Sequence, residues 1–228
     1  MNTHVFLITA KTNLHVGNEN GGDFIIVDKA IQRDPLTSLP CINSSSLKGA
    51  LKEYCCHLAD MKGEVKRLFG SDKTSNKDDA NKGEAIFFDA KLLFLPQQDK
   101  DSLFHYVTSN EVIGMMNDRV RLFDPSFDYK KPADYGGKKV EFATDSISTL
   151  CDNDSLPIIA RNALDNGESK NLWYEQVLPA ETVLYTIIRE EKNVLGEKLK
   201  DKIVQIGANA TIGYGYCKFT LLKTIKED

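Results

Sequence analysis

The chain has 228 residues, of which 41% are hydrophobic and 27% are charged, and its formal net charge is −4. These values are typical of one globular domain, and no apolar run approaches the roughly 20 residues that a membrane helix needs. The negative charge argues against a protein that coats nucleic acid through bulk electrostatics, although a local basic groove is compatible with it. Five cysteines without a CxxC pair predict neither a disulfide framework nor a zinc site. With no signal-peptide cleavage site near the start, we expect a cytoplasmic protein.

The first sixty residues predict a strand and then a helix. Apolar residues fill both alternating faces from Val5 to Leu14, which indicates a central strand. In NSSSLKGALKEYCCHLADM, residues 43–61, the serines are candidate N-caps and apolar residues recur at helical spacing. The expected buried face of this helix consists of Leu47, Leu51, Tyr54 and Leu58.

Between these two elements lies GGDFIIVDKAIQRDPLTSLP, residues 21–40, in which an apolar run meets a lone acid, Asp28, and then the cations Lys29 and Arg33. RNA carries its own nucleophile, the 2′-OH, so one carboxylate with a loosely bound divalent cation is enough to assist its cleavage. No carboxylate cluster accompanies Asp28, so a tightly held two-metal site is not expected. From the residues alone, Asp28 is either a catalytic acid or the end of a strand.

The middle of the chain predicts three segments. AIFFDAKLLFLP, residues 85–96, indicates one long strand or a bent pair that ends at Pro96. The apolar spacing of residues 109–123 predicts a short helix. Residues 124–157 are rich in Asp, Lys, Pro and Gly and have the composition of an insertion.

The last third is again regular. Two strand-like arms surround the turn signal Asn166–Gly167 and predict a long hairpin. We expect strands at 181–190 and 214–222, and between them a helix at 194–207. The order β-α-β, insertions, β-α-β predicts an α+β fold with a ferredoxin-like, RRM-like core.

Two stretches are candidates for binding an anion. The serine-rich helix start offers free N–H groups, the positive end of the helix dipole and the charge of Lys48 to a phosphate. In GANATIGYGYCKF, the glycines Gly213 and Gly215 permit close backbone approach or a phosphate cradle. A capped surface helix and a plain helix end are the alternative interpretations. A third candidate is a site with one acid among cations. It would form from the side chains of Asp28, His15, Arg33 and Lys48, but only if the first strand and the first helix are neighbours.

Seven stretches taken in order resemble the RAMP superfamily and, more narrowly, the repeated backbone subunit of the Cmr complex, a type III-B CRISPR RNA-guided effector. They are LHVGN, VDKAIQRDPLTSLPCINSSSLKGALKEY, LFGSD, IFFDAKLLFLP, FHYVTS, YEQVLPAETVLY and VQIGANATIGYGYCKF. Two stretches depart from the family pattern: Ala208 stands where the family usually has a glycine, and Cys41 and Asn43 stand where it commonly has an apolar residue and Pro-Gly.

The resemblance implies a single RAMP domain over residues 1–228, with a ferredoxin-like palm, an inserted lid region at about 105–157 and a thumb hairpin at about 160–176. It implies copies of the chain in a helical filament with guide RNA, target single-stranded RNA and other Cmr subunits. It further implies endonucleolytic cleavage of the guide-paired target at regular intervals, with a loosely bound Mg or Mn ion. Asp28 is then both the catalytic residue and the metal ligand.

By the same resemblance, RNA binding is expected of one set of residues: His15, Arg33, Ser45, Ser46, Lys48, Gly49, Arg161, Asn209, Gly213 and Gly215. Two other functions stay open. One is a non-catalytic, Csm-like scaffold subunit in which Asp28 only ends a strand. The other is a guide-processing RAMP ribonuclease, which relies on a histidine, and His15 is the only one suitably placed.

Overall fold

The computed structural model describes residues 1–17, 27–71 and 81–227. Its elements, in chain order, are β1 (Asn2–Ala10), β2 (Cys41–Ile42), α1 (Ser44–Cys56), η1 (Ala59–Met61), α2 (Glu64–Phe69), β3 (Ile86–Phe87), β4 (Ala90–Asp99), β5 (Leu103–Thr108), α3 (Asn110–Arg121), β6 (Asp134–Tyr135), β7 (Lys138–Phe142), α4 (Ile147–Leu150), β8 (Ile158–Asp165), β9 (Glu168–Gln176), β10 (Val183–Glu190), α5 (Val194–Leu199), β11 (Ile203–Gln205), η3 (Ala210–Ile212) and β12 (Tyr216–Lys226). No helix within these ranges is long and apolar enough to cross a bilayer.

One large sheet runs in the order β11-β12-β1-β10-β4-β5-β7-β6, with β2 paired to β4 and β3 to β10. β1 lies between β10 and β12, and every residue from Thr3 to Ala10 is buried. The predicted central strand is therefore confirmed, although it ends at Ala10. Leu14, the expected last residue, instead forms an isolated bridge with Leu178.

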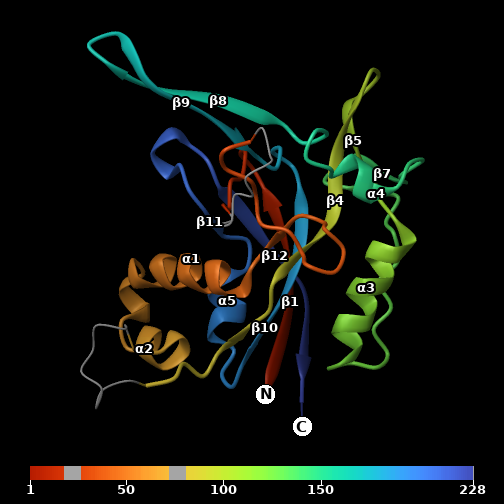
Figure 1. The fold of residues 1–228 in the computed structure, drawn as a ribbon. Coiled ribbons are helices and arrows are strands. Elements are labelled where there is room, and N and C mark those ends of the chain that lie inside the picture. Colours follow the sequence, from red (N-terminus) through yellow and green to blue (C-terminus); the bar gives the residue numbers. More distant parts are fainter. Residues whose placement is uncertain (18–26, 72–80, 228) are drawn as a thin grey trace.

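Helices cover both faces of this sheet, which explains why β1 has no polar side. α1 packs against β3 and β11, α5 packs against β10 and β12, and α3 packs against β4. Figure 1 shows α1, α2 and α5 on one side of the sheet and α3 on the other. The fold is therefore mixed α+β, as the sequence predicts, and the chain termini lie together on neighbouring strands (Figure 1).

Four neighbouring strands of the sheet are linked by the two connections that contain α1 and α5. In space they follow the order β12-β1-β10-β4, and each is antiparallel to its neighbour. α1 lies between β1 and β4 in the sequence, and α5 lies between β10 and β12. For the segment at 85–96, the sequence left two alternatives open, one long strand or a bent pair of strands. The structure shows the bent pair, because β3 and β4 are separate strands that both pair with β10.

Residues 124–157 contribute side chains to the same hydrophobic core. β7 continues the sheet by pairing in parallel with β5. The buried side chains from this segment are Phe127, Val140, Ile147, Cys151 and Leu156. The segment is polar in composition, but its few, widely spaced apolar side chains pack into the core.

The predicted hairpin is confirmed as β8 and β9, which form a sheet of their own. Its turn has positive φ at Asn166 (50°) and Gly167 (86°), the backbone of the primed turns that suit hairpins. Figure 1 shows the hairpin projecting away from the rest of the molecule. Leu164 and Leu172 are 64% and 54% exposed, so the far part of the hairpin has little packing of its own.

The prediction of a helix at 194–207 is wrong for the second half of this range. α5 ends at Leu199, because Asp201 adopts the left-handed conformation (φ 58°) and its N–H donates to the carbonyl of Phe219. The chain then enters β11, where Ile203 is 55% exposed instead of lying on a helix face. The first helix is also shorter than expected, since α1 ends at Cys56 and the η1 turn follows.

Candidate nucleic-acid interface

Asp28 lies at the base of the hairpin, where the chain runs alongside β9. The N–H of Lys29 donates to the carbonyl of Tyr174 at 3.1 Å, and the N–H of Gln176 donates to the carbonyl of Lys29 at 2.9 Å. Asp28 Oδ2 accepts a 2.7 Å hydrogen bond from the N–H of Tyr174. The Asp28 side chain is exposed. One carboxylate oxygen is thus fixed while the group faces solvent.

Of the apolar run that precedes Asp28, only Val27 lies within the described residues, and it is buried. Phe24, Ile25 and Ile26 lie outside the described residues, so the strand expected there is not tested.

Next to this position, a buried acid gathers three of the predicted RNA-binding residues. Glu175 is 1% exposed. Its Oε2 accepts hydrogen bonds from Arg161 Nε and Asn209 Nδ2, both at 2.8 Å. Its Oε1 lies 3.5 Å from His15 Nε2. The hairpin, the segment after β1 and the loop before β12 therefore meet at one carboxylate.

The partners of Glu175 keep it ionised in spite of its burial. Burial raises the pKa of the Glu175 carboxyl, but the hydrogen bonds from Asn209 and Arg161 and the nearby His15 outweigh it and hold this pKa below its ordinary value. His15 Nδ1 contacts the carbonyl of Gln176 at 2.7 Å, and since a carbonyl only accepts, Nδ1 carries a proton. His15 itself is 2% exposed, so it contacts Glu175 from the protein interior and not from the solvent side.

A groove of about 600 Å³ separates α1 from the loop that leads into β12. Ser46, Ala50 and Tyr54 line it from α1. Gln205, Gly207 and Tyr216 line the opposite side. The groove is open to solvent on the face of the sheet that carries α1 and α5 in Figure 1.

Glycines shape the loop that borders this groove. Gly215 has φ 78°, and a Cβ there would lie 2.0 Å from the carbonyl oxygen of Ile206. Gly207 has φ 82°, and its Cβ would lie 2.2 Å from the carbonyl oxygen of His15. Gly213 also has positive φ, 84°, but a Cβ there would meet open space. The prediction of close backbone approach is thus confirmed at Gly215, whereas Gly213 presents its backbone outward.

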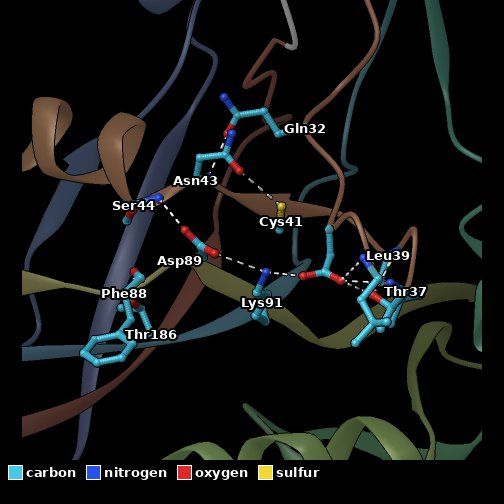
Figure 2. Close-up of polar contacts among 12 residues, drawn as sticks. Gln32, Thr37, Leu39, Cys41, Asn43, Ser44, Phe88, Asp89, Lys91 and Thr186 are labelled. Atoms are coloured by element: carbon cyan, nitrogen blue, oxygen red, sulfur yellow. Dashed lines mark hydrogen bonds and ion pairs between the residues drawn. The ribbon is translucent and has the colours of Figure 1, made fainter.

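The serines at the start of α1 do not cap this helix, so the expected serine cap is wrong. Side chains from other segments of the chain bind its first N–H groups instead. The N-cap residue is Asn43, whose side chain makes no capping hydrogen bond. The N–H of Ser44 donates to Asp89 Oδ1 at 2.8 Å, and the N–H of Asn43 donates to Gln32 Oε1 at 2.8 Å (Figure 2). Two side chains from other segments therefore satisfy the first helical donors.

The remaining predicted residues of α1 differ in their surroundings. Ser46 Oγ accepts a 3.0 Å hydrogen bond from Gln32 Nε2 at the edge of the groove. Ser45 and Gly49 are exposed. Lys48 is half-buried, with its Nζ 5.9 Å from the centre of the Phe87 ring.

A charged triad ties the loop after Lys29 to the start of α1. Lys91 forms ion pairs with Asp34 and, at 3.2 Å, with Asp89, the residue that caps α1 (Figure 2). Asp34 Oδ1 also accepts from the N–H and hydroxyl of Thr37. Burial raises the pKa of Asp34, but its hydrogen bonds from Lys91 and Thr37 outweigh this and hold it at about 2. The triad therefore fixes the loop that follows the Asp28 segment.

The structure gives separate contacts to Asp28, His15, Arg33 and Lys48, and within the described residues no hydrogen bond or ion pair joins two of them. Arg33 donates from Nη1 to the carbonyl of Ser38 at 2.9 Å and shapes its own loop. Burial lowers the pKa of Arg33, and the nearby Cys151 and Asp152 oppose that shift. Arg33 thus faces the 151–152 segment instead of the Asp28 carboxylate.

The described residues contain no cluster of three or more His, Cys, Asp or Glu side chains that fits a metal ion. A protein site of that kind is not needed for Mg²⁺, which proteins often bind through one or two carboxylates together with substrate phosphates. The solvent-facing Asp28 carboxylate fits this mode.

Substitution of Gly215 tests the close approach of the loop. We expect Gly215→Ala to lower the free energy of unfolding by clearly more than Gly213→Ala, because only the former forces a Cβ against a carbonyl oxygen. Gly213→Ala should cost about 1 kcal/mol, the cost of left-handed backbone alone. Urea unfolding of the two variants measures the difference, and equal losses would show that the predicted clash is relieved without cost.

The low pKa of Asp34 predicts an acid-dependent loss of stability. Its pKa in the fold, about 2, lies below the ordinary 3.8. The corresponding stabilisation, about 2 kcal/mol, is therefore complete above pH 4 and is lost as the pH falls towards 2. Asp34→Asn should lower stability at pH 7 and flatten the decline between pH 5 and 2.5. The exposed control Asp201→Asn should keep the wild-type slope, and an unchanged slope in Asp34→Asn would contradict the triad's role.

Comparison with known proteins supplies the family. The model of the RAMP superfamily matches residues 7–218. The CRISPR system Cmr endoribonuclease Cmr4 of Pyrococcus furiosus is 26% identical over an alignment of 278 positions, which covers 92% of each chain. A cryo-EM structure of type III-B Cmr-beta in the apo state has a TM-score of 0.77 at 21% identity, covering 97% of both chains.

Two other solved structures share the fold. Type III-B Cmr-beta bound to cognate target RNA gives a TM-score of 0.77 at 20% identity over 96% of each chain. Oligomeric Cmr4 from Pyrococcus furiosus gives 0.65 at 22% identity over 99% of this chain and 100% of that one. The family match extends from β1 into β12 and includes the hairpin and the groove, so this chain belongs to the RAMP superfamily.

Proposed function

We propose that this chain is a guide-RNA-binding backbone subunit of a type III-B CRISPR effector and that it cleaves the target RNA paired to the guide. The observation that carries the proposal is the solvent-facing Asp28 carboxylate, held by the N–H of Tyr174 at the base of a projecting hairpin. The relative named Cmr endoribonuclease and the similar Cmr-beta structure with target RNA support the same class of function.

In this proposal, the fold divides into the parts that such a subunit needs. The strands in the order β12-β1-β10-β4, with α1 and α5, serve as a ferredoxin-like palm. Residues 105–157 serve as the lid, and the β8–β9 hairpin serves as the thumb. The exposed Leu164 and Leu172 are suited to contact RNA bases or another copy of the chain.

The groove between α1 and the glycine-shaped loop is the proposed path of the guide backbone. Ser46 lines it from α1, Ser45 and Gly49 are exposed on the same helix, and Gly213 offers its outward backbone from the loop. Lys48, whose Nζ lies 5.9 Å from the centre of the Phe87 ring, is not part of the groove lining and is proposed to contact the guide beside it. Backbone N–H groups and one lysine contact phosphates without reading sequence. His15, Arg161 and Asn209 act through Glu175, by holding the loop and hairpin in register.

Cleavage requires little from the protein because RNA supplies the nucleophile. The Asp28 carboxylate accepts the proton of the 2′-OH, the 2′ oxygen bonds to phosphorus, and the bond from phosphorus to the 5′ oxygen breaks. The leaving 5′ oxygen takes a proton from solvent, which gives a 2′,3′-cyclic phosphate and a 5′-hydroxyl end. The hairpin contributes by displacing a base so that this geometry is reached.

A divalent ion would be held by Asp28 and the RNA phosphates together, and it would supply charge neutralisation at the phosphate when bound. The remaining partners follow from the same assignment: guide RNA, target single-stranded RNA, further copies of the chain in a filament and other Cmr subunits, in the cytoplasm.

The decisive substitution is Asp28→Asn, which keeps the shape of the side chain and removes its basicity. In complex assembled on guide RNA, cleavage should fall at least about 100-fold, while target binding stays near wild type, because the carboxylate acts in the transition state. The exposed Asp201→Asn is the control and should cleave normally. A wild-type rate in Asp28→Asn would leave a scaffold subunit as the function.

Lys48→Ala tests the proposed contact of Lys48 with the guide. Loss of one phosphate contact should weaken RNA binding and reduce the slope of log K against log salt by about 0.7. The control Lys200→Ala removes the same charge from the end of α5 and should leave the slope unchanged. Equal slopes for Lys48→Ala and wild type would show that Lys48 does not contact the guide.

A further inference from the structure

Lys29, the neighbour of Asp28, has a placement that the proposed function does not yet use. Its backbone is fixed on both sides, since its N–H and carbonyl bond to Tyr174 and Gln176 of β9. Its side chain is exposed, and its Nζ lies 5.0 Å from the centre of the Trp173 ring. A long, flexible cation is therefore held in one place, on the residue that follows Asp28.

Consecutive residues of the two segments form matched contacts. Asp28 is held by the N–H of Tyr174, and Lys29 by the ring of Trp173, the residue just before it. Trp173 is the only tryptophan of the chain and is half-buried at the hairpin base. The same strand thus positions an acid and a cation on the solvent side of the hairpin base.

Charge balance explains why the pairing matters. A lone carboxylate repels the phosphodiester that it must approach, and the transition state of cleavage adds negative charge to the non-bridging phosphate oxygens. In the described ranges, the structure gives no ion pair between Lys29 and any carboxylate, Asp28 included, so its ammonium is available to a ligand. Contact with an aromatic face holds a cation without neutralising it.

We propose that Lys29 is a further catalytic residue, whose ammonium binds the non-bridging oxygens of the scissile phosphate, and that Trp173 is a positioning residue acting through it. The inference rests on the proposed function. Lys29 exchanges no proton in the step: the 2′ oxygen still bonds to phosphorus as the bond to the 5′ oxygen breaks. The ligand class is an RNA phosphodiester, recognised by charge and not by base.

The test uses complex assembled on guide RNA with Lys29→Met, which keeps an unbranched stem for packing on Trp173 but removes the charge. Cleavage under single-turnover conditions should fall about 10- to 100-fold, with a much smaller change in target affinity. Lys29→Arg should restore most of the rate, because a guanidinium is also a cation that stacks on indole. Lys200→Met is the charge-matched control and should cleave normally.

Trp173→Leu separates positioning from direct contact. If the ring acts through Lys29, the double variant with Lys29→Met should be no slower than Lys29→Met alone, whereas independent roles multiply the two losses. Multiplied losses would overturn the positioning role of Trp173. In wild type, emission of the single tryptophan should change on target binding, and in Lys29→Met it should report an intact hairpin base.

The outcomes distinguish this inference from the proposed function. Loss of cleavage in Asp28→Asn together with a wild-type rate in Lys29→Met overturns the role of Lys29 alone. Retained cleavage in Asp28→Asn overturns the proposed function itself. A loss in Lys29→Met that Lys29→Arg fails to restore would show that packing, and not charge, is what the position supplies, and would also overturn the proposal.

Discussion

The hydrogen bonds between residues 28–29 and β9 are the contact on which the rest of the site depends. The backbone of Lys29 pairs with the hairpin base, and the Tyr174 N–H fixes one oxygen of Asp28. A loop residue with an exposed side chain would otherwise sample many positions, and ordering it for a ligand would cost entropy. By binding that residue to a strand, the fold orders the carboxylate in the free chain and ties its position to the hairpin.

Two ionic groups, each built on one buried acid, extend this constraint to the groove. Glu175 joins the hairpin to the glycine-shaped loop through Arg161 and Asn209. Lys91 joins the loop around Asp34 to the start of α1 through Asp89. Removing one partner of such a network leaves an uncompensated buried charge, so each group specifies one arrangement of its segments. The groove and the Asp28 carboxylate consequently hold a fixed relation.

The sequence predicted the parts that depend on local periodicity and failed where distant contacts decide. β1, α1 and the hairpin follow from their apolar spacing and the Asn166–Gly167 turn. The helix expected through Ile203 fails because Asp201 turns left-handed to pair with Phe219, a contact invisible in the local pattern. Glu175 was missed for the same reason, since its partners lie 14 to 160 residues away; its only local signal is an acid where an exposed arm enters the core.

We propose that one ordered carboxylate suffices for cleavage because the RNA provides the nucleophile. The most direct measurement is cleavage of a target RNA that carries a single 2′-deoxy substitution at one mapped scissile nucleotide. Cleavage should stop at that nucleotide alone, the other sites should continue at their normal rate, and their products should end in 2′,3′-cyclic phosphate. Continued cleavage at the substituted nucleotide, with 3′-hydroxyl and 5′-phosphate ends, would show that water is the nucleophile and would contradict it.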